Sequence, residues 1–237
     1  HIMLILPDME LSHVISEINA GICKVYGMTV DQEFYALGNP DMSSLGTKVK
    51  TVNPDVVCLF EMSPLRAIRE AGWTGQFFSV ATNSIEAILA TASPEDIEGF
   101  IGTAYPTEFD PPLTQTAADF KEAYTTLFGR WDNPAPSDAA LYSAIIAALE
   151  QAQSTDPDKV AEVLANGMEW DSPCGPLRMV ARPDMGNTRT VDSINTIYMK
   201  QVVGGKATLL DTVDLDTAAA YFADYLDKAP PAGPPPN

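Results

Sequence analysis

The feature that most constrains this chain is a repeated unit of one strand followed by one helix. The unit occurs four times between Leu4 and Tyr105 and closes on a fifth strand. Val56–Phe60, inside this repeat, contains no polar residue, as expected for a strand that helices cover on both faces. Strand, helix and strand at this spacing connect by right-handed crossovers. The repeat therefore predicts a parallel α/β sheet.

Apolar runs and capping signals locate the elements of this repeat. Asp41, Ser63-Pro64 and Thr82-Asn83 are candidate starts of helices. The strands are expected at Ile2–Leu6, Met28–Tyr35, Val56–Phe60, Gln76–Val80 and Gly99–Ala104.

Beyond a connector at Pro106–Pro112 the pattern changes to three helices and a hairpin. Leu113–Phe128 predicts a helix that ends at Gly129, and Asp156-Pro157 starts another that stops at Gly167. Between them, Ser137 or Asp138 is expected to cap a helix with five inward residues: Leu141, Ala144, Ile145, Ala148 and Leu149. The remaining predictions are a hairpin of Thr190–Val203 and Lys206–Val213 around Gly204-Gly205, a short helix at Thr217–Leu226 and a disordered Pro-rich tail at Ala229–Asn237.

The turns that follow the strands of a parallel sheet meet at one edge, where open α/β sheets bind ligands. Glu61 directly follows an apolar strand; it can meet a ligand cation or simply be a loop residue. Tyr105 and Tyr142 can be aromatic walls or core residues, and His13 can line the crevice or lie on a helix surface. The residues predicted to bind a ligand at this edge are Ser12, Glu61, Met62, Ser63, Thr82, Asn83 and Tyr105. The hydroxyl and amide groups among them can instead serve only as helix caps.

Composition and motifs exclude several functions. The net charge of −18 repels nucleic acid and anionic lipid. No GxSxG, Walker, GxGxxG or HExxH motif occurs, so we expect no catalysis, no metal and no cofactor. Cys23 falls on a helix pattern and Cys58 in an apolar strand, so both are expected in the core, whereas Cys174 lies near a loop where it can be exposed. The spacing of the three cysteines fits no zinc or redox motif. The chain has neither a transmembrane run nor a signal peptide.

An ordered series of stretches resembles the type I periplasmic-binding-protein superfamily, specifically the substrate-binding proteins of branched-chain-amino-acid-type ABC transporters. The resemblance covers most of residues 4–215 and includes Asn53-Pro54-Asp55-Val56-Val57 before an apolar strand and a late Gly175-Pro176-Leu177. The stretches that carry it are LILPDMELSHVISEINAGICKVYGMTV, KVKTVNPDVVCLFEMSPLRAIREAGWTGQFFSVATNS, FKEAYTTLFGRWDNPAPSDAALYSAIIAALEQA and KVAEVLANGMEWDSPCGPLRM.

The resemblance implies two Rossmann-like lobes joined by a hinge, with the ligand closed between them. Residues 1–105 and 178–228 resemble the second lobe, and residues 106–177 resemble part of the first. The fold class is thus α/β: one Rossmann-like parallel-sheet lobe, part of another lobe with three helices, and a late β-hairpin. Because a strand opens the chain and the family has more sequence before it, we expect the N-terminal part of the first lobe to be missing.

The resemblance also implies a function: an extracytoplasmic protein, periplasmic or membrane-associated outside the cell, that binds a small polar solute and delivers it to an ABC permease. The solute would be an amino acid, an amide or an organic acid. In amino-acid binders an acidic residue after the fourth strand of this lobe holds the ammonium group. Ala81-Thr82-Asn83, the matching place here, has no acid, and Glu61, after the preceding strand, is a candidate substitute. The alternative is a ligand-sensing receptor or regulator domain of the same fold. An α/β enzyme is the third and least favoured alternative.

A chain that lacks part of a lobe should bind its solute weakly or not at all and should self-associate. The apolar stripes of the helices at Leu113–Phe128 and Leu141–Leu149 would then have no sheet to cover them.

Overall fold

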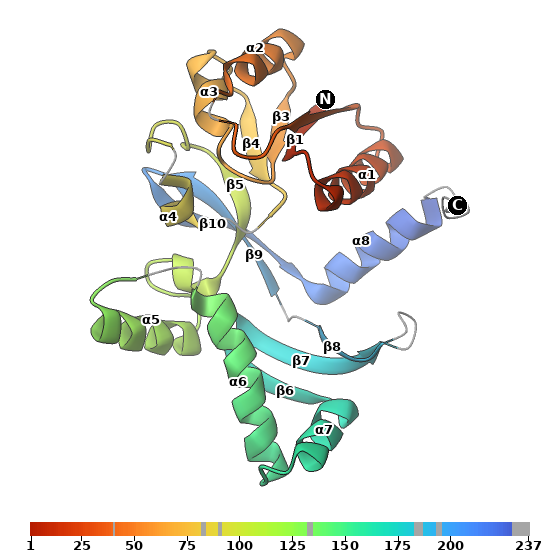
Figure 1. The fold of residues 1–237 in the computed structure, drawn as a ribbon, viewed down its shortest axis with the longest axis vertical. Helices are drawn as coiled ribbons and strands as arrows, with labels where there is room; N and C mark the ends of the chain where they lie inside the picture. Colours follow the sequence, from red (N-terminus) through yellow and green to blue (C-terminus); the bar gives the residue numbers. More distant parts are fainter. Residues whose placement is uncertain are drawn as a thin grey trace. The chain divides into compact units, whose positions relative to one another are not determined.

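The structure is a computed structural model that describes residues 1–39, 41–81, 84–89, 92–131, 135–182, 187–192 and 196–228. The chain divides into two compact units (Figure 1). Unit 1 consists of His1–Thr103, Gln201–Gly205 and Asp216–Asn237, and unit 2 consists of Ala104–Lys200 and Lys206–Leu215.

The core of unit 1 is a parallel sheet. Strand β1 (Ile2–Pro7) pairs in parallel with β2 (Val30–Tyr35) on one side and with β3 (Val56–Leu59) on the other. Strand β4 (Gln76–Ser79) pairs in parallel with β3 and with β5 (Ile101–Ala104). The order β5-β4-β3-β1-β2 confirms the predicted five-stranded parallel sheet.

Helices cover both faces of this sheet. Leu4 and Leu6 pack with Ala20 of helix α1 (Glu10–Val25) on one face. Met3 and Ile5, which alternate with them and point to the other face, are 1% and 0% exposed. Figure 1 shows α1 on one side of the strands and α2 with α3 on the other. The helices of unit 1 are α1 (Glu10–Val25), α2 (Ser43–Val52), α3 (Leu65–Glu70), α4 (Ile85–Leu89) and α8 (Leu215–Lys228), the last longer than predicted.

Two predicted helix starts have different outcomes. The N-cap of α2 is Met42, and Asp41, one residue earlier, accepts the N–H of Ser43 through its Oδ1 at 2.9 Å. The predicted cap at Ser63 is wrong: α3 begins at Leu65 and no side chain caps it. A turn comes first, closed by the N–H of Leu65 donating to the carbonyl of Met62 at 3.0 Å. The turn leaves the Ser63 side chain exposed at the end of β3.

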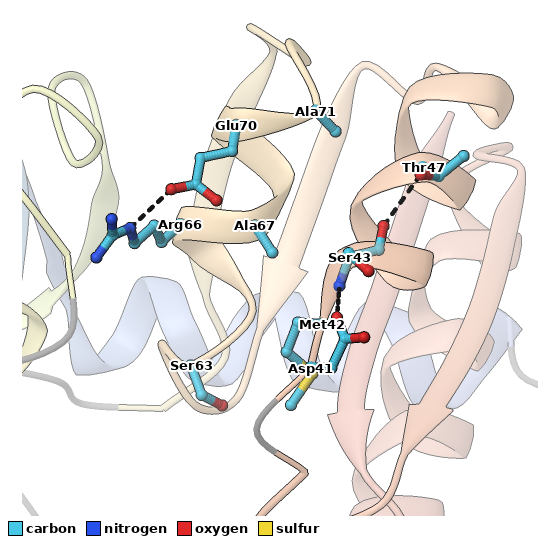
Figure 2. A pocket seen from close by; sticks show the side chains of 9 residues that line it. All are labelled: Asp41, Met42, Ser43, Thr47, Ser63, Arg66, Ala67, Glu70 and Ala71. Carbon is cyan, nitrogen blue, oxygen red and sulfur yellow. Dashed lines mark hydrogen bonds and ion pairs between the residues drawn. The ribbon is translucent and has the colours of Figure 1, made fainter.

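Helices α2 and α3 pack closely at Gly46. Figure 2 shows Ala67 and Ala71 turned towards α2, and a Cβ at Gly46 would lie 2.4 Å from the carbonyl oxygen of Ala67. We expect Gly46→Ala to lower the free energy of unfolding by about 1–3 kcal/mol, because the helices must separate. This loss outweighs the gain of about 1 kcal/mol that alanine brings to a helix interior.

Urea denaturation can measure this change, with Gly21→Ala in α1 as the matched control. A Cβ at Gly21 meets only the hydroxyl of Tyr225, at 3.1 Å, and that flexible side chain can move. The control should therefore be neutral or stabilising by up to about 1 kcal/mol. Equal effects of the two substitutions would contradict the close approach of α2 and α3.

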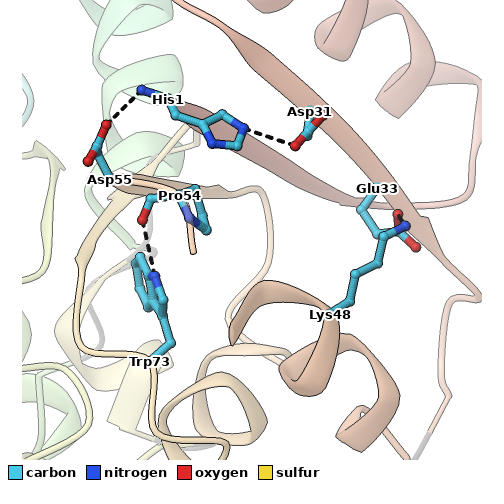
Figure 3. A network of polar contacts seen from close by, with 7 residues as sticks. All are labelled: His1, Asp31, Glu33, Lys48, Pro54, Asp55 and Trp73. Atoms are coloured by element: carbon cyan, nitrogen blue, oxygen red, sulfur yellow. Dashed lines mark hydrogen bonds and ion pairs between the residues drawn. The ribbon is translucent and has the colours of Figure 1, made fainter. Parts of the chain in front are cut away.

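Polar contacts at the amino ends of the strands hold the opposite edge of the sheet (Figure 3). The indole N–H of Trp73 donates to the carbonyl of Pro54 at 3.1 Å, and the His1 ring lies 2.9 Å from the Asp31 carboxylate. None of the predicted ligand-binding residues takes part in these contacts.

Unit 2 packs helices against a three-stranded antiparallel sheet. Its strands β6 (Met168–Ser172) and β7 (Gly175–Arg182), which pair antiparallel, were not predicted from the sequence. The alternation of Met168 and Trp170 with Glu169 and Asp171 in the sequence was a short signal of β6. Unit 2 also contains the 3₁₀ turn η1 (Pro106–Glu108) and helices α5 (Gln115–Phe128), α6 (Ala135–Ala152) and α7 (Pro157–Asn166).

Local signals located two of these three helices well. Gly129 ends α5 in the left-handed conformation, with φ of 68°. Asp156 caps α7, because its side chain accepts the N–H of Asp158. The predicted cap of α6 at Ser137 or Asp138 is wrong, since this helix already begins at Ala135.

The buried face of α6 matches the prediction only in part. Ala144 and Ala148, expected to point inward, are 9% and 0% exposed as predicted, and Ala140 joins them at 7%. Leu141 and Ile145, also expected to point inward, are 65% and 57% exposed. Small side chains let the helix approach β6 closely, so the large apolar residues lie on the opposite face.

The late hairpin is confirmed at its turn and corrected in its first strand. Gly204 and Gly205 have φ of 58° and 73°, as a two-residue hairpin turn requires. They connect β9 (Thr196–Val203) to β10 (Lys206–Asp214). The expected single strand Thr190–Val203 is wrong, because β8 (Asn187–Asp192) is a separate strand that pairs with β7. The predicted tail, 229–237, lies outside the described residues.

Candidate functional site

A cluster of polar side chains surrounds Tyr35 at the carboxyl edge of the sheet in unit 1. Tyr35 ends β2 and lies beside Pro7, which ends β1. Its hydroxyl is 3.3 Å from Oε2 of Glu61 and 3.4 Å from Oγ of Ser63, both of which follow β3. The parallel register thus brings three strand ends together, as open α/β sheets do at their ligand sites.

The environment of Tyr35 keeps its hydroxyl a donor. The side chain is 7% exposed, and this burial raises the pKa of Tyr35 to about 12, with the nearby Glu61 carboxylate adding to the effect. The phenol therefore stays protonated and can donate to the carboxylate. Sequence reasoning missed Tyr35, although its position at the end of a predicted strand was a usable signal.

Ser12 and Met62 are buried. Ser12 is 0% exposed in the first turn of α1, where Met9 is the N-cap, so the alternative that Ser12 caps this helix is wrong. Its hydroxyl has no hydrogen-bond partner within the described part of the chain. Met62 is 6% exposed, and its carbonyl accepts the N–H of Leu65. A ligand contact by either side chain would require some local opening.

Thr82 and Asn83 lie outside the described residues. The residues just before them are described: the N–H of Val80 donates to the carbonyl of Leu59 at 3.0 Å. The end of β4 is therefore next to the end of β3, beside Glu61.

The aromatic candidates have separate outcomes. Tyr105 belongs to unit 2, where it is half-buried and precedes η1; burial raises the pKa of its hydroxyl. Tyr142 is 68% exposed, so the alternative that it is a core residue is wrong. His13 is an exposed helix residue whose Nε2 lies 2.8 Å from the Asp8 carboxylate. Its ring lies against Phe34, with centroids 4.1 Å apart.

Two hollows adjoin this edge. One, of about 530 Å³, lies between α2 and α3 (Figure 2). The other, of about 360 Å³, includes Tyr35. Asp41 and Met42 line both hollows, and Ser63 lines the larger one. A charged pair on the wall of the larger hollow, Arg66 with Glu70, is satisfied within α3 at 2.9 Å.

The chemistry of this edge is that of hydrogen-bond recognition. Phenol, hydroxyl and carboxylate groups can bind a polar molecule, and a carboxylate also attracts a cation. Burial raises the pKa of the Cys58 and Cys174 thiols to about 12, so neither is a ready thiolate. Cys23 and Cys58 are buried as predicted, and Cys174 is partly buried. Within the ranges that the structure describes, no group of three or more His, Cys, Asp or Glu residues could hold a metal ion.

One protein family matches the sequence. Its profile, described as "Periplasmic binding protein", covers residues 1–206. No curated protein sequence matches the chain. In the described part of the chain, every helix is too short or too polar to span a bilayer.

Solved structures share the fold at low sequence identity. A leucine binding protein from Thermotoga maritima matches with a TM-score of 0.70 and 19% identity, over 91% of this chain and 61% of that one. A solute binding protein of an ABC transporter from R. palustris, in complex with benzoate, matches with a TM-score of 0.71 and 14% identity, over 90% and 58%. A leucine-, isoleucine-, valine-, threonine- and alanine-binding protein from Brucella ovis matches with a TM-score of 0.70 and 16% identity, over 91% and 58%. The chain thus spans 58–61% of the length of these three structures.

Proposed function

Since this chain belongs to the periplasmic binding protein family, we propose that it acts as the solute-binding component of an ABC importer. Outside the cytoplasm, it would bind a small polar solute, such as an amino acid, an amide or an organic acid, and deliver it to a membrane permease. The role is binding and delivery rather than catalysis.

The single observation that carries the proposal is the cluster of Tyr35, Glu61 and Ser63 at the carboxyl edge of the sheet. Two of its members were predicted to bind ligand, and its groups suit a solute with hydrogen-bonding ends. Proteins of the same fold are named for leucine and solved with benzoate. Glu61 favours a solute with an ammonium group, such as leucine, over an anionic acid such as benzoate, because a carboxylate attracts a cation and repels an anion.

The substitution Glu61→Gln tests the role of this carboxylate. Leucine and benzoate, titrated into the chain, should bind weakly and perturb the NMR signals of Tyr35, Glu61 and Ser63. We expect Glu61→Gln to weaken leucine binding by roughly tenfold or more, because a charge-assisted hydrogen bond is lost. Benzoate binding should not weaken.

The matched control is Glu70→Gln, which removes an exposed carboxylate that Arg66 already pairs. It should leave both affinities unchanged. Perturbations that fall away from the carboxyl edge, or an equal loss in the control, would show that Glu61 is not the solute contact.

Self-association is a second part of the proposal. Large apolar side chains on α5 and α6 lie open to solvent, an arrangement typical of surfaces that another protein part covers. A second copy of the chain can provide that cover. The most exposed of them are Leu127 at 76%, Tyr142 at 68%, Leu141 at 65%, Phe128 at 59% and Ile145 at 57%.

Sedimentation velocity over a range of concentrations tests this association. We expect Ile145→Glu to weaken it by roughly tenfold, because a charge then enters the apolar contact. Thr51→Glu, which adds the same charge at an exposed position of α2, should have no effect. A chain that sediments as a monomer at all concentrations would contradict the proposal.

A further inference from the structure

A buried ion pair in unit 2 joins Lys200 of β9 to Glu108, the last residue of η1. The side chains are 0% and 3% exposed. Removing two charges from water costs more than their attraction often returns, and apolar residues frequently replace such pairs without loss of stability. The pair therefore suggests a role other than stability.

The position of the pair gives the first indication of that role. The chain passes from unit 1 to unit 2 between Thr103 and Ala104, and it returns between Lys200 and Gln201. Glu108 lies just after the first passage and Lys200 just before the second. Within unit 2, the pair thus ties together two segments that are far apart in the sequence and both lead to unit 1.

The carboxylate of Glu108 has a second partner. Its Oε2 meets Lys200, while its Oε1 accepts the backbone N–H of Tyr105 at 3.0 Å. The N–H of Glu108 in turn donates to the carbonyl of Tyr105 at 3.0 Å. Because the charged lysine holds one oxygen, the other is directed at the backbone of Tyr105.

We propose that Lys200 and Glu108 are positioning residues for Tyr105. Lys200 orients the carboxylate, the carboxylate holds the Tyr105 backbone, and this contact sets where the Tyr105 ring can meet a solute. The inference rests on the proposed function, in which Tyr105 is a ligand contact.

Hydrogen exchange of the Tyr105 amide, followed by NMR without solute, measures the positioning directly. The first variant is Lys200→Met/Glu108→Leu, which replaces the pair by apolar side chains. We expect its Tyr105 amide to exchange roughly tenfold faster or more, relative to the amide of Ala148 in the core of α6. Lys200→Met alone should also speed this exchange, because the carboxylate loses the group that orients it.

Lys121→Met is the matched control. Lys121 also holds this turn, through the carbonyl of Thr107 at 2.8 Å, but it does not act through Glu108. The control should leave the Tyr105 exchange ratio unchanged. The inference is overturned if the exchange rate of the Tyr105 amide relative to that of Ala148 is unchanged in the double variant, or if it rises equally in the control.

A second double variant covers the case in which the first does not fold. Lys200→Met/Glu108→Gln keeps an acceptor near Tyr105 without the charge that orients it, and faster exchange is again expected. A wild-type ratio in this variant overturns the inference. Because the measurement needs no solute, it can fail while solute binding at Glu61 stands, and the reverse also holds.

Discussion

Replacing Trp73 by alanine is expected to lower the free energy of unfolding by about 3–5 kcal/mol. Trp73 is 3% exposed and lies edge-on to Phe77, with ring centroids 5.0 Å apart. Its indole N–H also donates to the carbonyl of Pro54 at 3.1 Å (Figure 3). The substitution removes a large buried ring, leaves a cavity and takes the donor from a carbonyl. Urea denaturation with a circular-dichroism signal measures the loss.

Two control variants separate these contributions. Trp73→Phe keeps a ring in the core but removes the donor, so we expect a smaller loss of roughly 1–3 kcal/mol. Leu37→Ala truncates a large apolar residue that is 60% exposed, and its effect should stay within about 0.5 kcal/mol. Equal losses for Trp73→Ala and Leu37→Ala would contradict the buried position of Trp73.

The single substitution Lys200→Met is expected to cost about 3–5 kcal/mol, because it leaves the carboxylate of Glu108 buried without its cation. The double substitution Lys200→Met/Glu108→Leu should lie within about 1 kcal/mol of the wild type, since neither charge is then buried. Urea denaturation of the wild type, both single variants and the double variant gives the coupling energy of the pair.

Arg66→Met is the control for this cycle. The pair of Arg66 and Glu70 is 66% and 61% exposed, so its loss should cost less than about 1 kcal/mol. A cost for Lys200→Met no larger than that of the control would show that Lys200 and Glu108 are not a desolvated pair.

The parts of the fold that the sequence predicted are those with local causes. The apolar run Val56–Phe60 indicated a strand covered on both faces, and its core became β3 of the parallel sheet. Gly129 and Gly204-Gly205 marked a helix end and a hairpin turn, because only glycine adopts positive φ without strain. These features depend on a few neighbouring residues, so a sequence pattern reports them directly.

The missed parts depend on partners far along the chain. Strand β6 is short and carries the charged residues Glu169 and Asp171, so its sequence alone does not identify a strand. Its pairing with β7 and its packing against α6 do. On α6 the large residues Leu141 and Ile145 were expected on the buried face together with Ala144 and Ala148, but the two alanines are buried and the two large residues are exposed. Periodicity can identify a helix, yet it cannot say which of two apolar faces finds a partner.

In the site, the same division holds. Glu61 and Ser63 were predicted because they follow a strand in the sequence, which requires only the strand itself. That Tyr35 joins them was decided by the parallel register of β2, β1 and β3. Lys200 and Glu108 are 92 residues apart, and a charged residue in a strand is normally expected to be exposed. The sequence alone determined the parallel sheet and the edge where its strand ends meet, through local backbone preferences, whereas only tertiary packing, by desolvating groups and bringing distant ones together, decided which side chains lie in contact.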